Sequence, residues 1–76
     1  MNKVRRNRID EVISKLAELK DEIDSLYDEE QEAYDNLPES LQYSERGENM
    51  QNAIDNLDYA SSSLDEVIDY LSEAQE

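Results

Sequence analysis

Carboxylates are the side chains of this sequence that could do chemistry. Asp and Glu supply 21 of the 76 residues against seven Lys and Arg, and the formal net charge is −14. Paired carboxylates can act as acid and base in hydrolysis, bind calcium, or attract a basic surface. The sequence has no His and no Cys, which removes the usual general base, thiol nucleophile and transition-metal ligands. We therefore expect no catalytic residue, no cofactor and no enzymatic activity.

The acidic stretches also lack the pattern of a dedicated metal site. No segment matches the calcium-loop pattern D-x-[DN]-x-[DN]-G, and the dense stretch DSLYDEE at residues 24–30 contains no glycine. A di-iron helical bundle needs Glu-x-x-His, which a chain without His cannot supply. The sequence predicts no metal ligands, so attraction of a basic partner is the remaining role for these carboxylates.

Charge is unevenly distributed along the chain. Residues 1–20 carry six of the seven basic residues and three acidic ones, whereas residues 21–76 carry eighteen acidic residues and one base. Such an acidic body repels nucleic acid and anionic membranes and attracts basic proteins. The cluster near the start either neutralises the acidic end of a neighbouring helix or grips a phosphate backbone. We favour neutralisation, because few positive charges stand against so many negative ones. The cluster comprises Lys3, Arg5, Arg6 and Arg8.

Hydrophobic periodicity predicts two long helices that position these charges. Apolar residues recur at spacings of three and four through residues 4–36 and again through 45–74, which is typical of helices with one apolar face. Their matched lengths predict an all-α, antiparallel two-helix hairpin that forms one domain, residues 1–76. In heptad lettering the stripe occupies a (Ile9, Leu16, Ile23, Glu30; Met50, Leu57, Leu64, Leu71), d (Val12, Leu19, Leu26, Ala33; Ala53, Ala60, Val67, Ala74) and e (Ile13, Lys20, Tyr27, Tyr34; Ile54, Ser61, Ile68).

The connection between the helices, residues 37–44, is expected to contain a short helical turn. Asn36 and Glu39 have the spacing of a capping box, which predicts a turn over residues 38–43. The single Pro of the sequence suits the start of such a turn. Ser44 is the predicted N-cap of the second long helix, and the single Gly that follows weakens the predicted start of that helix.

The hairpin predicts which residues meet and how much apolar surface is left over. Leu19 should face Leu64, and Leu16 should face Val67, so that apolar side chains meet in each layer. The a/d/e stripe is broader than two helices can cover. We therefore predict a homodimer that forms a four-helix bundle, or burial of the surplus against a target. Glu30 interrupts the stripe, and it either reaches solvent or sets register by taking a basic group.

The acidic face is the predicted binding surface. Residues 21–36 hold eight acidic residues over about 24 Å of helix. The two helices together approach one carboxylate per roughly 2 Å, against about 1.7 Å per phosphate in duplex DNA. A surface of this density could imitate DNA and occupy a nucleic-acid-binding cleft. Exposed Tyr is common in protein interfaces, so Tyr59 is added to the predicted binding residues. The predicted partner-binding residues are Asp21, Glu22, Asp24, Asp28, Glu29, Glu32, Asp35, Asp58, Tyr59, Asp65 and Glu66.

The segment EEQEAYDNLPESLQYSERGENMQNAIDNL, residues 29–57, resembles short acidic helical-hairpin proteins encoded by phages and mobile elements of Gram-positive bacteria. The similarity centres on YDNLPESLQ, SERGE and AIDNL and carries no catalytic signature. Most of these proteins are uncharacterised. The resemblance favours antagonism of a host defence nuclease as the reason for an acidic surface.

Three functions follow, and the first is our main hypothesis. It is an inhibitor that imitates the charge of nucleic acid and blocks a basic nucleic-acid-binding protein. The alternative is a structural or assembly module that oligomerises or docks a partner helix through its apolar stripe. A third is an antitoxin or regulatory subunit that covers a basic toxin. No apolar run reaches the roughly 20 residues of a membrane span, and the start does not read as a signal peptide. We expect a cytoplasmic protein.

Overall fold

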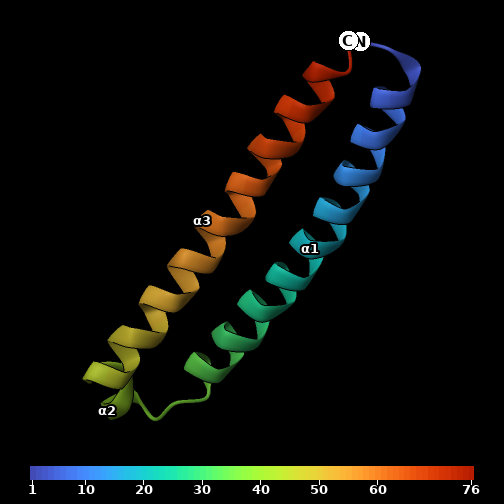
Figure 1. Ribbon diagram of the computed structural model, residues 1–76. Helices are drawn as coiled ribbons and strands as arrows, with labels where there is room; N and C mark the ends of the chain where they lie inside the picture. Colours follow the sequence, from blue (N-terminus) through green and yellow to red (C-terminus); the bar gives the residue numbers. More distant parts are fainter.

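The computed structural model describes all 76 residues, which form three helices and no strand, so the predicted helical class is confirmed. The helices are α1 (Lys3–Asp35), α2 (Glu39–Gln42) and α3 (Glu45–Ala74). The two long helices lie side by side and run in opposite directions, with both termini at one end and α2 at the other (Figure 1). The molecule is a rod with extents of 58 × 15 × 11 Å.

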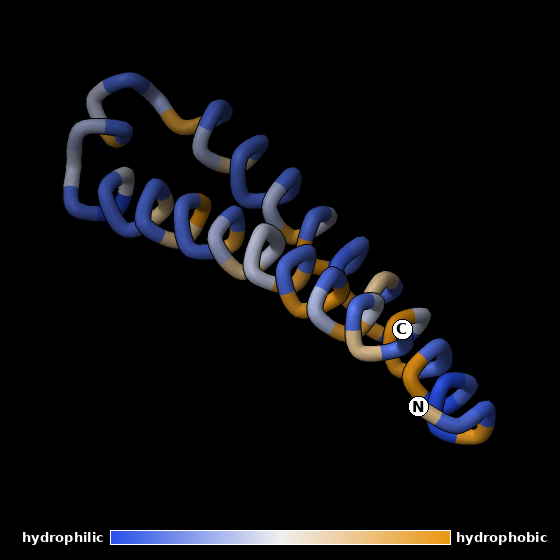
Figure 2. Tube along the Cα trace, turned by 90° about the horizontal axis from the view of Figure 1, so that it is seen from above, coloured by the Kyte–Doolittle hydropathy of each residue, from blue (hydrophilic) through white to orange (hydrophobic).

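Short hydrophobic and hydrophilic segments alternate within the turns of both long helices (Figure 2). This alternation reflects the one-sided apolar pattern of the sequence, in which each turn of helix contributes one or two apolar residues. No helix of the structure combines the length and the apolar character that crossing a membrane requires.

The helix ends differ from the predicted capping pattern. Asn36 has an αR backbone (φ −84°, ψ −6°) and ends α1, whereas an N-cap needs extended geometry. Pro38 takes the N-cap position of α2 with an extended backbone and no side-chain hydrogen bond. The predicted capping box between Asn36 and Glu39 is therefore wrong. The N-cap of α1 is Asn2, whose Oδ1 accepts a hydrogen bond from the Arg5 N–H at 2.8 Å.

The start of α3 is fixed by close packing against α2. Ser44 has the extended backbone of an N-cap, but its hydroxyl donates to the Leu41 carbonyl oxygen and caps no N–H of α3. Gly47 is buried in the first turn of α3, where an added Cβ would overlap the Gln42 carbonyl oxygen. The glycine therefore permits a close approach of two backbones. The sequence alone predicted only that this glycine weakens the start of the helix.

The seam between α1 and α3 is built from positions a and e, and the predicted a/d seam is wrong. Leu16 and Leu64 at position a are half-buried, as expected. The partners predicted for them at position d, Val67 and Leu19, are 41% and 50% exposed. The best buried residues of α3 after Gly47 are Ile54 and Ser61, both at e. The contact face is thus rotated from d toward e.

Gly47→Ala gives a test of the packing between α2 and α3. Alanine at an unconstrained helical site stabilises by about 1 kcal/mol over glycine. Here the overlap with α2 should reverse the sign and lower the unfolding free energy by about 1–3 kcal/mol. Thermal or urea unfolding followed by circular dichroism measures the change.

The matched control is Ser62→Ala, at an exposed site in the middle of α3. It should change the unfolding free energy by less than about 0.5 kcal/mol. A stabilised Gly47→Ala variant would contradict the close approach of the two backbones.

Candidate functional site

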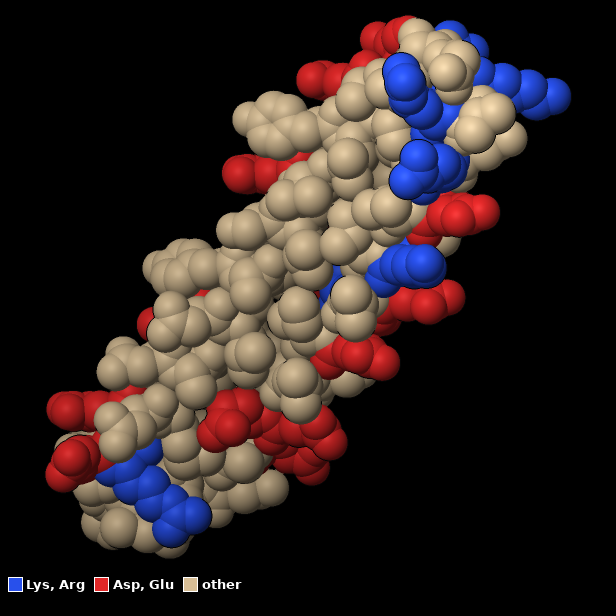
Figure 3. Space-filling model, in the orientation of Figure 1, with Lys and Arg blue, Asp and Glu red and all other residues tan.

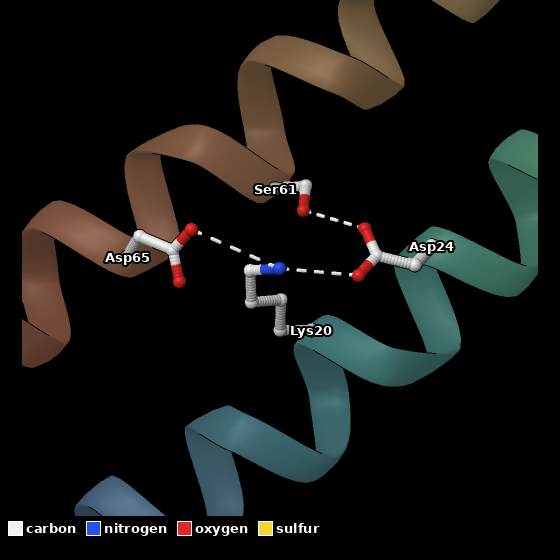
Figure 4. Close-up of polar contacts among 4 residues, drawn as sticks. All are labelled: Lys20, Asp24, Ser61 and Asp65. Carbon is white, nitrogen blue, oxygen red and sulfur yellow. Dashed lines mark hydrogen bonds and ion pairs between the residues drawn. The ribbon is translucent and has the colours of Figure 1, made fainter.

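Four polar residues cross-link the two long helices near the middle of the rod (Figure 4). The Lys20 Nζ lies 3.1 Å from the Asp24 Oδ2 and 3.8 Å from the Asp65 Oδ2. The Ser61 hydroxyl donates to the Asp24 Oδ1 at 2.5 Å. Lys20 and Asp24 lie on α1, whereas Ser61 and Asp65 lie on α3. The cluster therefore ties the helices together along the e side of the seam.

The pKa values of two groups in this cluster are shifted. The hydrogen bond from Ser61, followed by that from Lys20, holds the pKa of the Asp24 carboxyl below its usual value. The hydrogen bond to Asp24 raises the pKa of the Lys20 ammonium, against a smaller opposing effect of desolvation. Both shifts favour the charged forms, so the cluster stays an ion pair at neutral pH.

The cluster gives two of the predicted partner-binding residues contacts within the fold. Asp24 is half-buried and its two carboxylate oxygens are both engaged, so it holds the fold together and has no free oxygen to aim at a partner. Asp65 contacts Lys20 through one oxygen and keeps an exposed side chain. Sequence reasoning missed this role. The sequence does contain a signal for it. Lys20 occupies position e, Asp24 follows one turn later on the same helix, and Ser61 places a small hydroxyl side chain at position e of the other helix.

The other predicted residues lie exposed on the outside of the rod. Asp21, Asp28 and Asp35 recur every seven residues on α1 and form no ion pair with a base. Asp35 accepts one hydrogen bond, from the Gln31 amide at 3.1 Å. We call the exposed acidic members of the set that form no ion pair the acidic surface: Asp21, Glu22, Asp28, Glu29, Glu32 and Asp35 of α1, and Asp58 and Glu66 of α3. Tyr59 is exposed beside Asp58.

The basic cluster at the start of α1 does not neutralise the neighbouring helix end through ion pairs. The ion pairs of the structure all involve Lys20. The contacts that join the two ends are made by Gln75, whose amide donates to the Arg6 carbonyl oxygen and to Asp10. The expected neutralisation thus involves no ion pair at contact distance, and Gln75 is the residue of α3 that forms hydrogen bonds with the start of α1. The positive charges at this end are left available.

A second surface is formed by the exposed residues at position d. In an antiparallel pair, equal heptad positions of the two helices fall on the same side of the plane through their axes. We call this side the d face; its exposed apolar members are Val12, Leu19, Leu26 and Ala33 of α1 and Ala60, Val67 and Ala74 of α3. Figure 3 shows a broad uncharged band along the rod, with carboxylates along its rims and basic side chains gathered toward the end that holds the termini.

The two ends of the d face carry shallow depressions of different character. Near the termini, Arg5, Arg8 and Lys15 surround Val12. Near the connection, Glu30 of α1 shares a depression with Arg46 and other residues of α3. Glu30 is half-buried there and forms no ion pair. The d face is therefore positive at one end and apolar in the middle.

No group of three or more potential ligands that could hold a metal ion is present. No protein-family model, curated protein or solved structure matches the chain. The acidic surface and the d face are the two candidate sites that the geometry offers.

Ser61→Ala tests the polar cluster through its pH dependence. The lowered pKa of Asp24 stabilises the fold above the unfolded pKa of about 3.9, and this stabilisation is lost as pH falls through the folded value. Removing the Ser61 hydroxyl should raise the Asp24 pKa and lower Tm by about 5 °C at about pH 7. The difference between variant and parent should shrink near pH 2. Carboxyl-carbon NMR titration and thermal unfolding measure both effects.

The control for this variant is Ser63→Ala, on the exposed side of α3. It should leave the Asp24 titration in place. An unchanged Asp24 pKa in Ser61→Ala would contradict the hydrogen bond as the main cause of the shift.

Proposed function

We propose that this chain is a non-enzymatic binding protein whose acidic surface covers the nucleic-acid-binding site of a basic protein. The observation that carries the proposal is the line of exposed carboxylates at Asp21, Asp28 and Asp35, none of which is paired with a base. Unpaired surface charges of one sign create a strong local potential, which speeds encounter with an oppositely charged partner.

The spacing of these carboxylates supports imitation of nucleic acid. A seven-residue repeat on a straight helix places successive members about 10.5 Å apart. Glu22, Glu29 and Glu32 fill the intervals beside the line, and all three are exposed. A rigid helix holds these charges in a fixed pattern, so a partner does not have to order them on binding.

A nucleic-acid-binding protein of a host cytoplasm, such as a defence nuclease, is the target class that we favour. A cleft evolved for phosphates holds the Lys and Arg side chains that pair best with carboxylates. The resemblance of residues 29–57 to proteins of phages and mobile elements supports the same target class. An inhibitor of this kind needs no catalytic group, since occupying the cleft is sufficient.

A second candidate function is supported by a separate observation. Val12, Leu19, Leu26 and Val67 leave 41–52% of their surface exposed on the d face. Contiguous exposed apolar residues are typical of association surfaces. In an assembly module this face would dock a partner or another copy as part of a helical bundle, and the acidic surface would only keep the assembly in solution.

Charge reversal separates the two functions. The triple variant Asp21→Lys, Asp28→Lys and Asp35→Lys should weaken binding to a basic nucleic-acid-binding target at least about tenfold if the acidic surface makes the contact. A matched control reverses three exposed acids elsewhere, Glu39→Lys, Glu48→Lys and Glu73→Lys. Both variants have the same net charge, so only a contact at the α1 line distinguishes them.

The target is first recovered from host cytoplasm by affinity capture at low salt, and its binding is then measured directly. Affinity should fall steeply between about 50 and 500 mM salt, because exposed charge pairs are screened. Duplex DNA or RNA should compete with the chain for the captured protein. Binding that is indifferent to salt and to nucleic acid, or equal loss in both triple variants, would contradict the proposal.

A further inference from the structure

We propose that the d face binds the d face of a second copy of the chain, with the α1 helices of the two copies packed antiparallel about Leu19. The proposal does not depend on what the acidic surface binds. It specifies the arrangement of the dimer and the residues that determine it.

The apolar residues of the d face are grouped about the middle of the rod. Leu19 is 50% exposed on α1, and Val67 is 41% exposed on α3. The contact between Lys20 and Asp65 places these two stretches at the same level along the rod. Leu19 and Val67 therefore lie close to the point about which a two-fold axis would relate the copies. On either side of Leu19, Val12 and Leu26 are equidistant in sequence.

A two-fold axis at Leu19 matches the apolar residues of one α1 with those of the other. Leu19 meets Leu19 of the second copy, and Val12 meets Leu26 of the second copy, because an antiparallel arrangement pairs residues on opposite sides of the centre. On α3, the small side chains of Ala60 and Ala74 flank Val67 and permit close approach. Burying these residues removes from water the surface that the a/e seam leaves exposed.

The charges beside the apolar residues decide the orientation. Position g of α1 borders position d, and its residues change sign at the centre: Arg8 and Lys15 on one side, Glu22 and Glu29 on the other. Facing g residues pair in antiparallel helices, as they do in coiled coils. The same axis therefore pairs Lys15 with Glu22 of the second copy, and Arg8 with Glu29 of the second copy.

The opposite orientation offers no such pairing. Stacking the copies with their termini at the same end would place α1 of one copy on α3 of the other. The g positions of α3 are uncharged: Asn49, Asn56, Ser63 and Tyr70. Arg8 and Lys15 have no ion-pair partner within their own chain, and the antiparallel dimer supplies one for each.

The dimer and the acidic surface can be tested separately. Glu22 and Glu29 border the dimer interface, but Asp21, Asp28 and Asp35 occupy position f, on the side of the helix away from the d face. The triple reversal at these three positions should weaken target binding at least about tenfold and leave the dimer intact. Failure of one proposal therefore does not imply failure of the other.

The mass in solution is the first test. At about 150 mM salt, where charges beyond about 8 Å are screened, sedimentation equilibrium of the full chain should give twice the 8.9 kDa chain mass. Leu19→Glu should give the monomer mass. The matched control Tyr59→Glu changes a residue on the outside of α3 that is 66% exposed, against 50% for Leu19, and should stay dimeric. A monomeric parent chain at about 100 μM overturns the proposal, as does a dimeric Leu19→Glu.

Charge exchange tests the orientation and does not require a variant that removes apolar contacts. Lys15→Glu and Glu22→Lys should each weaken dimerisation about tenfold, because each places like charges opposite one another in both halves of the interface. The double variant exchanges the two charges and should return the dimerisation constant to within about threefold of the parent. Rescue supports the antiparallel pairing, and a double variant weaker than both single variants overturns it.

A single cysteine gives a direct readout of proximity in a chain that has none. Leu19→Cys should form an interchain disulfide on mild oxidation, since the axis brings residue 19 against itself within disulfide reach. Tyr59→Cys, on the outside of α3, should remain reduced under the same conditions. A dimer that forms no bond at residue 19 would overturn the arrangement.

Discussion

Two helices touch along a line, and this constraint shapes the whole molecule. Each long helix carries apolar residues at a, d and e, but a single neighbour covers only part of that width. As a result Ile54 is the one large apolar residue that is buried, with 7% of its surface exposed, and Leu19 keeps half of its surface in water. The fold leaves an apolar surface exposed because no third long helix covers it.

Polar contacts decide which part of the stripe is covered. Ser61 donates a hydrogen bond across the e side of the seam to Asp24, which also accepts one from Lys20 of its own helix. Gln51 donates to the Tyr34 hydroxyl further along the same side. These bonds turn both helices so that e faces inward and d faces out. The apolar d face and the line of Asp21, Asp28 and Asp35 then lie on different sides of the rod, whereas Glu22 and Glu29 border the d face.

Helix class and element order were accessible from periodicity, since apolar spacings of three and four depend only on the local sequence. The rotation of the seam could not be predicted in this way. In the sequence, Lys20 and Ser61 only interrupt an apolar stripe, and the structure is needed to show that they contact Asp24 and Asp65. The same holds for Gly47, whose need for space arises from the Gln42 carbonyl. Of the predicted binding residues, Asp24 forms hydrogen bonds that hold the two helices together. A role of the exposed residues in binding stays a prediction.

The concentration dependence of thermal unfolding tests most directly whether the two long helices of one chain need association with a second copy to be stable. If the open d face must be covered, folding is coupled to association and Tm rises with protein concentration. Circular dichroism between about 1 and 100 μM should show Tm increasing by several degrees. A Tm that is high and constant over this range, with a monomer mass throughout, would contradict this account.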